Sequence, residues 1–275
     1  MRSSGLTPAR SAINPAASRN PLPRISPWMA RWFLGYARNY ARKHFHAVRV
    51  AEERNAISAL GHPVLLYLNH PSWWDPIISA VLCSEYFRTY RHYSPIDAAA
   101  LQKYKLFGKI GFFGVSQNNQ RSARRLLEIG SQILSDNGSA LWVTPQARFA
   151  DVRERPLQIG TAVAHLARHS PDCIVLPVAI EYAFWEEKTP EALVRFGQPI
   201  KTSDLQHVWH KPEFFEAALS DTMNALAADS IQRNHNRFRI VVSGKAGIGG
   251  VYDVWRRFKA NLRGRNFNAE HGAHP

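Results

Sequence analysis

The chain has 275 residues, of which 45% are hydrophobic, enough for one large domain with short appendages. Only two cysteines are present, Cys83 and Cys173, which excludes a disulfide framework and fits buried thiols in a reducing compartment. Lysine and arginine total 35 against 21 acidic residues, and the resulting charge of +14 favours a polyanionic partner, either nucleic acid or an anionic bilayer.

The first 51 residues contain nine lysines and arginines and no acidic residue. Residues 1–23, rich in Ser, Ala, Pro and Arg, predict a disordered basic tail, although a transit peptide has a similar composition. Aromatic residues then recur at helical spacing among arginines, and Trp28, Trp32 and Tyr36 follow one another at four-residue intervals. We therefore expect residues 24–46 to form an amphipathic helix that lies on a membrane surface. The alternative is a helix that packs on the domain through its aromatic side chains.

After this helix, apolar strand-like runs alternate with helical patterns, as is typical of an α/β architecture. No run approaches the roughly 18–20 apolar residues that span a bilayer. Residues 47–260 are expected to form the domain, and residues 261–275 a flexible tail. The predicted strands are Pro63–Leu68, Phe87–Tyr93, Ser139–Thr144, Cys173–Glu181, Ala192–Phe196 and Phe238–Val242. The predicted helices are Trp73–Cys83, Asp97–Tyr104, Gln120–Leu134, Gln158–Arg168 and Glu213–Asn234.

The segment from Asn69 to Pro76 leaves the first of these strands and enters a helix. Reactive side chains are often found at such junctions, because rigid elements hold groups that remain accessible. His70 precedes Asp75 by five residues, so a turn can bring the carboxylate to one imidazole nitrogen and leave the other as a general base. The substrate hydroxyl would then be the nucleophile. Alternatively, Ser72 and Asp75 form a helix-capping box without a catalytic role.

Three further segments follow in order: Gly111-Phe-Phe-Gly-Val115, a strand that ends in a loop containing Pro145, and Leu176-Pro-Val178. Together with the His70–Asp75 segment they resemble the glycerolipid acyltransferase family, over roughly residues 61–180. The resemblance implies a mixed central sheet flanked by helices. It also implies catalytic roles for His70 and Asp75, and acyl transfer from acyl-CoA or acyl-carrier protein to a hydroxyl of a lysolipid.

The second and third segments depart from the family pattern. Gln117 stands where an arginine that holds acceptor phosphate is expected, and the sequence Thr-Pro-Gln-Ala-Arg replaces Phe-Pro-Glu-Gly-Thr. Arginines of the following loop are candidates to replace the missing cation, or else they pair with Asp151 and Glu154 in solvent. A helix start near Gln120 would also attract anions. The predicted substrate-binding residues are Asn69, Gln117, Arg121, Pro145, Gln146, Arg148 and Arg155.

We expect direct transfer in a ternary complex, without a cofactor, a metal or a covalent acyl-enzyme. His165 and His169 have helical spacing but no third ligand, so no metal site is predicted. The expected location is the cytoplasmic face of an anionic membrane, with the protein bound peripherally. The competing hypothesis is a basic nucleic-acid-binding protein without enzymatic activity. It leaves the four ordered segments unexplained, so no nucleic-acid partner is predicted.

Overall fold

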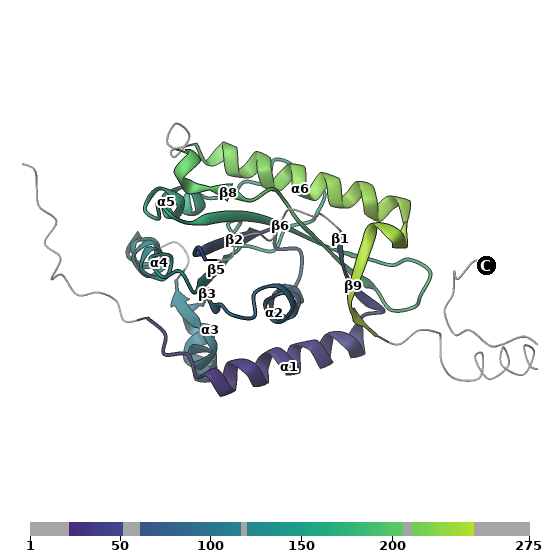
Figure 1. Ribbon diagram of the computed structural model, residues 1–275, viewed down its shortest axis with the longest axis horizontal. Helices are drawn as coiled ribbons and strands as arrows, with labels where there is room; N and C mark the ends of the chain where they lie inside the picture. Colours follow the sequence, from purple (N-terminus) through teal and green to yellow (C-terminus); the bar gives the residue numbers. More distant parts are fainter. Residues whose placement is uncertain (1–21, 52–60, 117–119, 206–210, 245–275) are drawn as a thin grey trace, which may run out of the picture.

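The computed structural model describes residues 22–51, 61–116, 120–205 and 211–244. Within them, strands form one sheet in the order β4-β3-β5-β2-β6-β7-β1-β9, and β8 pairs with β6 at the side (Figure 1). The strands are β1 (Ala47–Ala51), β2 (Val64–Leu68), β3 (Arg91–Asp97), β4 (Phe112–Val115), β5 (Ser139–Val143), β6 (Ile174–Ala183), β7 (Glu191–Phe196), β8 (Ile200–Lys201) and β9 (Phe238–Ser243).

The sheet is mixed. Strands β4, β3, β5, β2 and β6 run parallel to one another, whereas β7 is antiparallel to β6 and β9 is antiparallel to β1. The carboxyl ends of five neighbouring strands therefore meet at one edge of the sheet. In open α/β sheets, ligands bind at this edge.

Helices cover both faces of the sheet. They are α1 (Pro27–His44), α2 (Asp75–Tyr86), α3 (Ala98–Lys103), α4 (Gln120–Ile133), α5 (Ala162–Arg168) and α6 (Pro212–Gln232), with short 3-10 turns η1 (Lys105–Ile110), η2 (Thr202–Leu205) and η3 (His235–Arg237). One buried cluster joins α1 and α2 to the sheet, and a second joins α4, α5 and α6 to it. In Figure 1, α1 and α6 run along opposite sides of the molecule, and α2 lies between α1 and the strands.

The predicted α/β fold with a mixed sheet is confirmed, with several differences in the elements. Three strands were not predicted: β1, which has Arg49 at its centre, β4, which was interpreted only as a motif, and the two-residue strand β8. Strand β3 begins later than expected, since Phe87 still belongs to the buried end of α2 and Pro95 is accommodated within the strand. Helix α5 starts at Ala162 rather than Gln158, because Gln158 has a left-handed backbone (φ 54°) that interrupts a helix.

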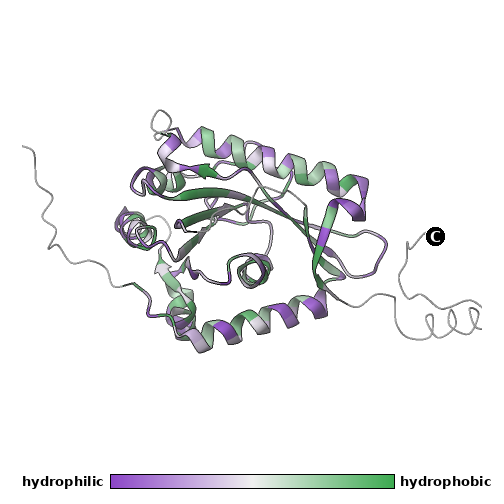
Figure 2. Ribbon diagram, viewed as in Figure 1, coloured by the Kyte–Doolittle hydropathy of each residue, from purple (hydrophilic) through white to green (hydrophobic). Residues whose placement is uncertain are grey.

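The predicted amphipathic helix is present as α1, with one face packed on the domain and another face exposed. Ala37 and Ala41 are fully buried against the domain, whereas Trp28 and Trp32 are 73% and 60% exposed. Figure 2 shows hydrophilic and hydrophobic residues as alternating bands along this helix, whereas the strands of the sheet are mostly hydrophobic. No helix among the described residues has the length and apolar character of a membrane span. Nearly all of the predicted tail at 1–23, and all of the one at 261–275, lie outside the described residues.

Candidate active site

The sheet fixes the backbone that presents His70. Strand β2 is buried along its whole length, and it ends at Leu68, two residues before the histidine. The Asn69 side chain, 2% exposed, then bonds to the neighbouring strand: its Nδ2 donates to the Ile180 carbonyl (2.9 Å), and its Oδ1 accepts from the Ile180 N–H (2.8 Å). Both polar ends of this amide are thus used within the fold. Asn69, predicted to bind substrate, has a structural position that joins the ends of β2 and β6.

His70 and Asp75 are brought together as the sequence predicts. Asp75 is the first residue of α2, and its Oδ2 lies 2.6 Å from Nδ1 of His70. The carboxylate side chain is 2% exposed, whereas the imidazole is 21% exposed and remains accessible. A carboxylate only accepts hydrogen bonds, so the tautomer that fits this contact has its proton on Nδ1 and a lone pair on Nε2. This arrangement is suited to general-base chemistry at Nε2.

The alternative capping interpretation is also partly correct. Asp75 Oδ2 accepts a hydrogen bond from the Ser72 backbone N–H (3.1 Å), as in one half of a capping box. The other half is absent in this turn, because Ser72 Oγ accepts from the Trp74 N–H (3.3 Å) and Asp75 N–H donates to the Ser72 carbonyl. One carboxylate oxygen therefore both closes the turn and orients His70.

A third side chain, not predicted from the sequence, completes the group. Tyr182, near the end of β6, donates its hydroxyl to Asp75 Oδ1 at 2.6 Å. Burial, and to a smaller extent the nearby Asp75 charge, raises the pKa of Tyr182 far above its usual range, so the phenol stays protonated. The predicted strand ended at Glu181, one residue before Tyr182. Alternate residues of a strand face the same side, so Tyr182 lies on the side of Val178 and Ile180, which faces α2.

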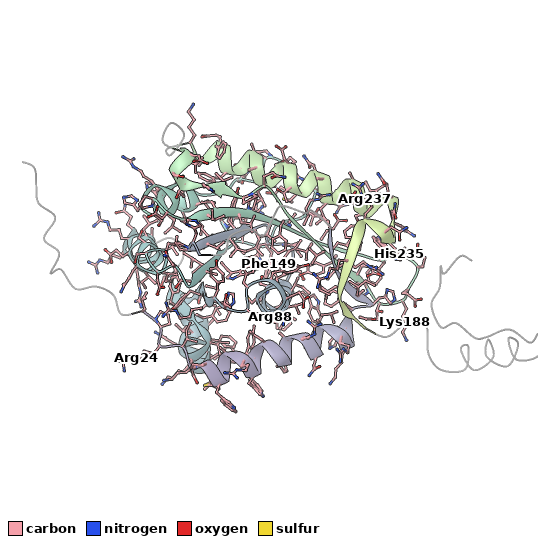
Figure 3. All side chains as sticks on the ribbon, viewed as in Figure 1. Arg24, Arg88, Phe149, Lys188, His235 and Arg237 are labelled. Atoms are coloured by element: carbon pink, nitrogen blue, oxygen red, sulfur yellow. The ribbon has the colours of Figure 1, made fainter. Side chains whose placement is uncertain are left out.

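The loop after β5 lies directly on His70. Gln146 is buried, and its Oε1 accepts from the His70 N–H (3.2 Å) while its Nε2 donates to the Leu157 carbonyl (3.1 Å). The Ala150 N–H donates to the His70 carbonyl (2.9 Å). The Phe149 ring lies 4.4 Å from the His70 ring, centre to centre. Figure 3 labels Phe149 near the middle of the molecule. The amide that replaces the family glutamate thus ties the loop to the backbone of the histidine.

The arginines of this loop already have partners. Arg148 pairs with Glu154 and Arg153 with Asp151, whereas Arg155 donates to Asn224 Oδ1 on α6 (2.8 Å). All three side chains are exposed, as the alternative of a solvated, internally paired loop requires. The acidic partners raise the pKa of both Arg148 and Arg153, and the same contacts lower those of Asp151 and Glu154.

The remaining predicted residues lie around this edge of the sheet. The Pro145 carbonyl accepts from the Gly160 N–H (3.0 Å), which closes the base of the loop. Arg121 occupies the first turn of α4 with an exposed side chain. Gln117 lies outside the described residues. The roles of these residues in substrate binding stay predictions.

Aromatic rings connect the exposed face of α1 to the His70–Asp75 turn. Successive ring centroids lie 5.3 to 5.8 Å apart along a path through Trp32, Tyr36, Tyr40, Trp74 and Trp73. Trp74 immediately precedes Asp75, and Trp73 is 64% exposed. This aromatic path therefore ends next to the candidate catalytic pair.

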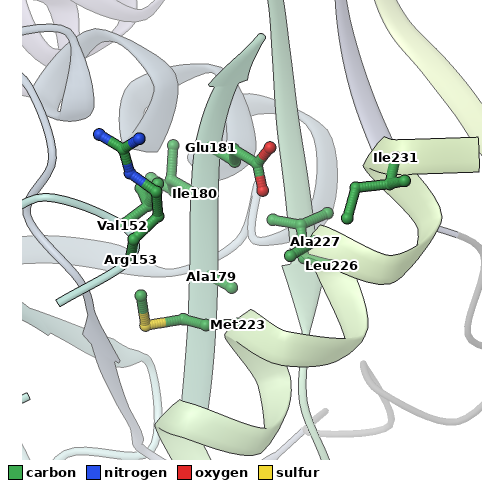
Figure 4. A pocket seen from close by; sticks show the side chains of 9 residues that line it. All are labelled: Val152, Arg153, Ala179, Ile180, Glu181, Met223, Leu226, Ala227 and Ile231. Atoms are coloured by element: carbon green, nitrogen blue, oxygen red, sulfur yellow. The ribbon is translucent and has the colours of Figure 1, made fainter. Parts of the chain in front are cut away.

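A cavity of about 250 Å³ lies on the other side of β6, between this strand, the loop at Val152 and α6 (Figure 4). Its lining is mostly apolar, with Ala179, Met223 and Leu226 on its walls and Glu181 at one side. Since Ala179 and Glu181 face away from the side of the strand that carries Tyr182, the cavity is separate from the His70–Asp75 pair. The described residues include no group of three or more His, Cys, Asp and Glu that is able to hold a metal ion.

Comparison with known proteins relates the chain to acyl-transferring enzymes. Residues 47–181 match the family model described as Acyltransferase. No curated protein matches the sequence. Among solved structures, the fold is similar to that of a 1-acyl-sn-glycerophosphate (LPA) acyltransferase, PlsC, from Thermotoga maritima. The two have 14% sequence identity and a TM-score of 0.48, over 73% of this chain and 79% of that chain. A structural likeness of this size carries no argument about substrates.

Proposed function

Since residues 47–181 match the acyltransferase family model, we propose that the chain transfers a fatty acyl group from a thioester to a hydroxyl of a lysolipid. The observation that carries this proposal is the pairing of an accessible His70 with a buried carboxylate, at the edge where five strand ends meet. The glycerolipid-type motifs of the sequence support a lipid as the acceptor.

In the proposed reaction, Nε2 of His70 takes the proton of the acceptor hydroxyl as its oxygen attacks the thioester carbonyl. Asp75 holds the ring through Nδ1 and stabilises the imidazolium that forms. The thiolate of coenzyme A or of a carrier-protein phosphopantetheine arm then leaves and takes a proton, which His70 can supply. The protein forms no covalent bond to the acyl group. The excess of basic residues suits either donor, because coenzyme A carries phosphates and acyl-carrier proteins are acidic.

The direct test is an acyl-transfer assay with palmitoyl-CoA, and separately palmitoyl-carrier protein, against a panel of phosphorylated and uncharged lysolipids. We expect transfer by the full chain and a loss of about 10²–10⁴-fold in the His70→Ala variant, as for a missing general base. Substitution of His165, an exposed histidine on α5, to alanine is the matched control and should leave the rate unchanged. An active, folded His70→Ala protein would exclude the mechanism.

We also propose that the protein binds peripherally to an anionic membrane surface, at the cytoplasmic face, through α1. Three exposed aromatic side chains, Trp28, Trp32 and Tyr36, project from this helix, and its last turn carries Arg42 and Lys43. Aromatic rings and basic side chains together suit the headgroup layer. The aromatic path then leads from this surface to Trp73 and Trp74 beside His70, which offers a lipid an apolar route to the site.

Membrane binding through α1 is best tested by point substitutions, because removal of the helix would disturb the fold. Arg38 on this helix donates to the Val241 carbonyl (2.7 Å), and Ala37 and Ala41 are part of the core, so a truncated chain would expose that core. Trp28→Ser with Trp32→Ser should reduce sedimentation with phosphatidylglycerol-containing vesicles. Phe214→Ser with Ile231→Ser, which removes exposed apolar groups from α6, is the matched control. Equal vesicle binding by the two double variants would contradict docking through α1. Tighter binding to oligonucleotides than to vesicles would favour the nucleic-acid hypothesis.

A further inference from the structure

Three donors surround the buried carboxylate of Asp75. Oδ2 accepts from His70 Nδ1 (2.6 Å) and from the Ser72 N–H (3.1 Å), and Oδ1 accepts from the Tyr182 hydroxyl (2.6 Å). The first two donors belong to the same turn as Asp75. Tyr182 comes from β6, 107 residues along the chain, and it lies one residue beyond the stretch that matches the family model.

The torsion that turns a carboxylate about its Cβ–Cγ bond is soft and has a two-fold profile, so contacts to one oxygen leave its plane poorly defined. A donor on the second oxygen removes this freedom. The 2.6 Å distance is that of a charge-assisted O–H···O⁻ bond, which is stronger than a neutral hydrogen bond. The ring of Tyr182 packs against the ring of Phe45, and the two ring centroids lie 5.6 Å apart.

We infer that Tyr182 is a positioning residue for acyl transfer: it fixes the Asp75 carboxylate so that Oδ2 faces His70, and it withdraws part of the negative charge that His70 experiences. This inference rests on the proposed function, because it acts through the His70–Asp75 pair. Tyr182 itself does not touch the reacting atoms.

The consequence of removing the hydroxyl has a definite sign. In Tyr182→Phe, Asp75 loses a donor and presents more negative charge to His70, so the imidazolium becomes more stable. The acidic limb of the pH profile of kcat/KM should move to higher pH by roughly half a unit to one unit. The carboxylate also becomes less well oriented, so kcat should fall about tenfold while KM for both substrates stays unchanged.

Other ionisable groups near the turn remain in place in this variant. Tyr40 and His44 of α1 pack on Trp74, and His46 is bound by Glu191. Glu181, the neighbour of Tyr182, faces α6 and accepts a hydrogen bond from Ser230 (2.8 Å). A shift of the pH profile in Tyr182→Phe is therefore attributable to the lost hydroxyl.

Tyr67→Phe is the matched control. Tyr67 is a fully buried tyrosine of β2 that donates one hydrogen bond, to the Phe215 carbonyl (3.1 Å), on the α6 face. Its loss should change stability without moving the pH profile. A second probe keeps both the ring and the hydroxyl: fluorotyrosine incorporated only at position 182. Its hydroxyl is a stronger hydrogen-bond donor to Asp75, so the acidic limb of the pH profile should move to lower pH.

The test combines steady-state kinetics with palmitoyl-CoA and oleoyl-lysophosphatidate and an NMR titration of the His70 ring, which needs no substrate. We expect the acidic limb of the pH profile and the His70 titration to move to higher pH in Tyr182→Phe, to lower pH in the fluorotyrosine protein, and not at all in Tyr67→Phe. If neither the His70 titration nor kcat changes in both position-182 variants, Tyr182 does not have the proposed role. If His70→Ala is inactive in the same assays, the proposed function stands although this inference fails. If His70→Ala is active, the function itself fails.

Discussion

The His70–Asp75 turn and the arginine-bearing loop of residues 148–155 lie at the same edge of the sheet, yet they are held in different ways. Besides its local hydrogen bonds, the turn is fixed to the rest of the fold by contacts between residues far apart in sequence: His70 to Gln146 across 76 positions, Asp75 to Tyr182 across 107, and Asn69 to Ile180 across 111. The ion pairs of the loop join residues two or six positions apart, and they are exposed.

We propose that this difference separates two roles, catalysis by the turn and acceptor recognition by the loop. Buried hydrogen bonds between strands hold the reactive group in one geometry, as general-base catalysis requires. Solvent screens exposed ion pairs and makes them weak, so Arg148 and Arg153 can exchange their carboxylate partners for a phosphate at little cost. We therefore expect substitutions in the turn to affect the chemical step or stability, and substitutions in the loop to affect the choice of acceptor.

Among substitutions in the turn and the loop, Asp75→Asn is expected to lower activity most. The amide keeps the shape but cannot stabilise an imidazolium, so kcat should fall roughly 10²–10⁴-fold, as in triads that lose their carboxylate. Asparagine is a good helix-capping residue, so the variant should fold normally. Activity close to that of the unmodified chain, measured with palmitoyl-CoA and a lysolipid, would mean that Asp75 only caps α2.

Asn69→Ala should instead affect stability. The substitution leaves the buried N–H and carbonyl of Ile180 without the amide partner, and the free energy of unfolding should fall by about 1–3 kcal/mol. Urea denaturation monitored by circular dichroism measures this loss. Asn39→Ala, at an exposed position of α1, is the control. Unchanged stability in Asn69→Ala would show that the amide does not join β2 and β6.

Arg148→Ala tests the loop. If the acceptor carries a phosphate, its KM should rise about three- to tenfold, with kcat and the KM of an uncharged lysolipid unchanged. Stability should stay close to that of the unmodified chain, since the pair with Glu154 is exposed and screened by solvent. If the acceptor is uncharged, Gln117→Arg should impair turnover because it places an unpaired cation against a neutral headgroup. If Arg148→Ala lowered kcat as much as Asp75→Asn, the loop would affect the chemical step as the turn does, which would contradict separate roles for the two regions.

The smallest effect concerns Ala147, which stands where the family pattern has glycine. Its φ of 53° lies in the left-handed region, where a Cβ is strained and glycine is not. Ala147→Gly should therefore stabilise the protein by roughly 0.5–1 kcal/mol. Thermal unfolding measures the change, and Ala123→Gly on the exposed side of α4 should destabilise by a similar amount. Destabilisation by both substitutions would show that Ala147 is not strained.

The sequence predicted those elements and residues that a short stretch of neighbouring residues is enough to indicate. The apolar runs located most strands, and the spacing of His70 and Asp75 predicted their contact. It could not predict β1, whose central Arg49 looks exposed but is buried through its bond to Glu191 (2.9 Å) 142 positions later. Tyr182 was missed for the same reason, since its partner becomes a neighbour only when β6 lies beside β2. Asn69 and Gln146 have the polar character expected of a site, yet their amides bond to the backbone.

In the proposed reaction, the lipid hydroxyl is activated by His70 and attacks the thioester without an acyl-enzyme intermediate. Intact-protein mass spectrometry after rapid mixing of the full chain with palmitoyl-CoA, with and without a lysolipid acceptor, tests this step. We expect no acyl adduct in either case, and release of coenzyme A only when the acceptor is present. A stoichiometric palmitoyl adduct formed without acceptor, and discharged when the lysolipid is added, would contradict direct transfer.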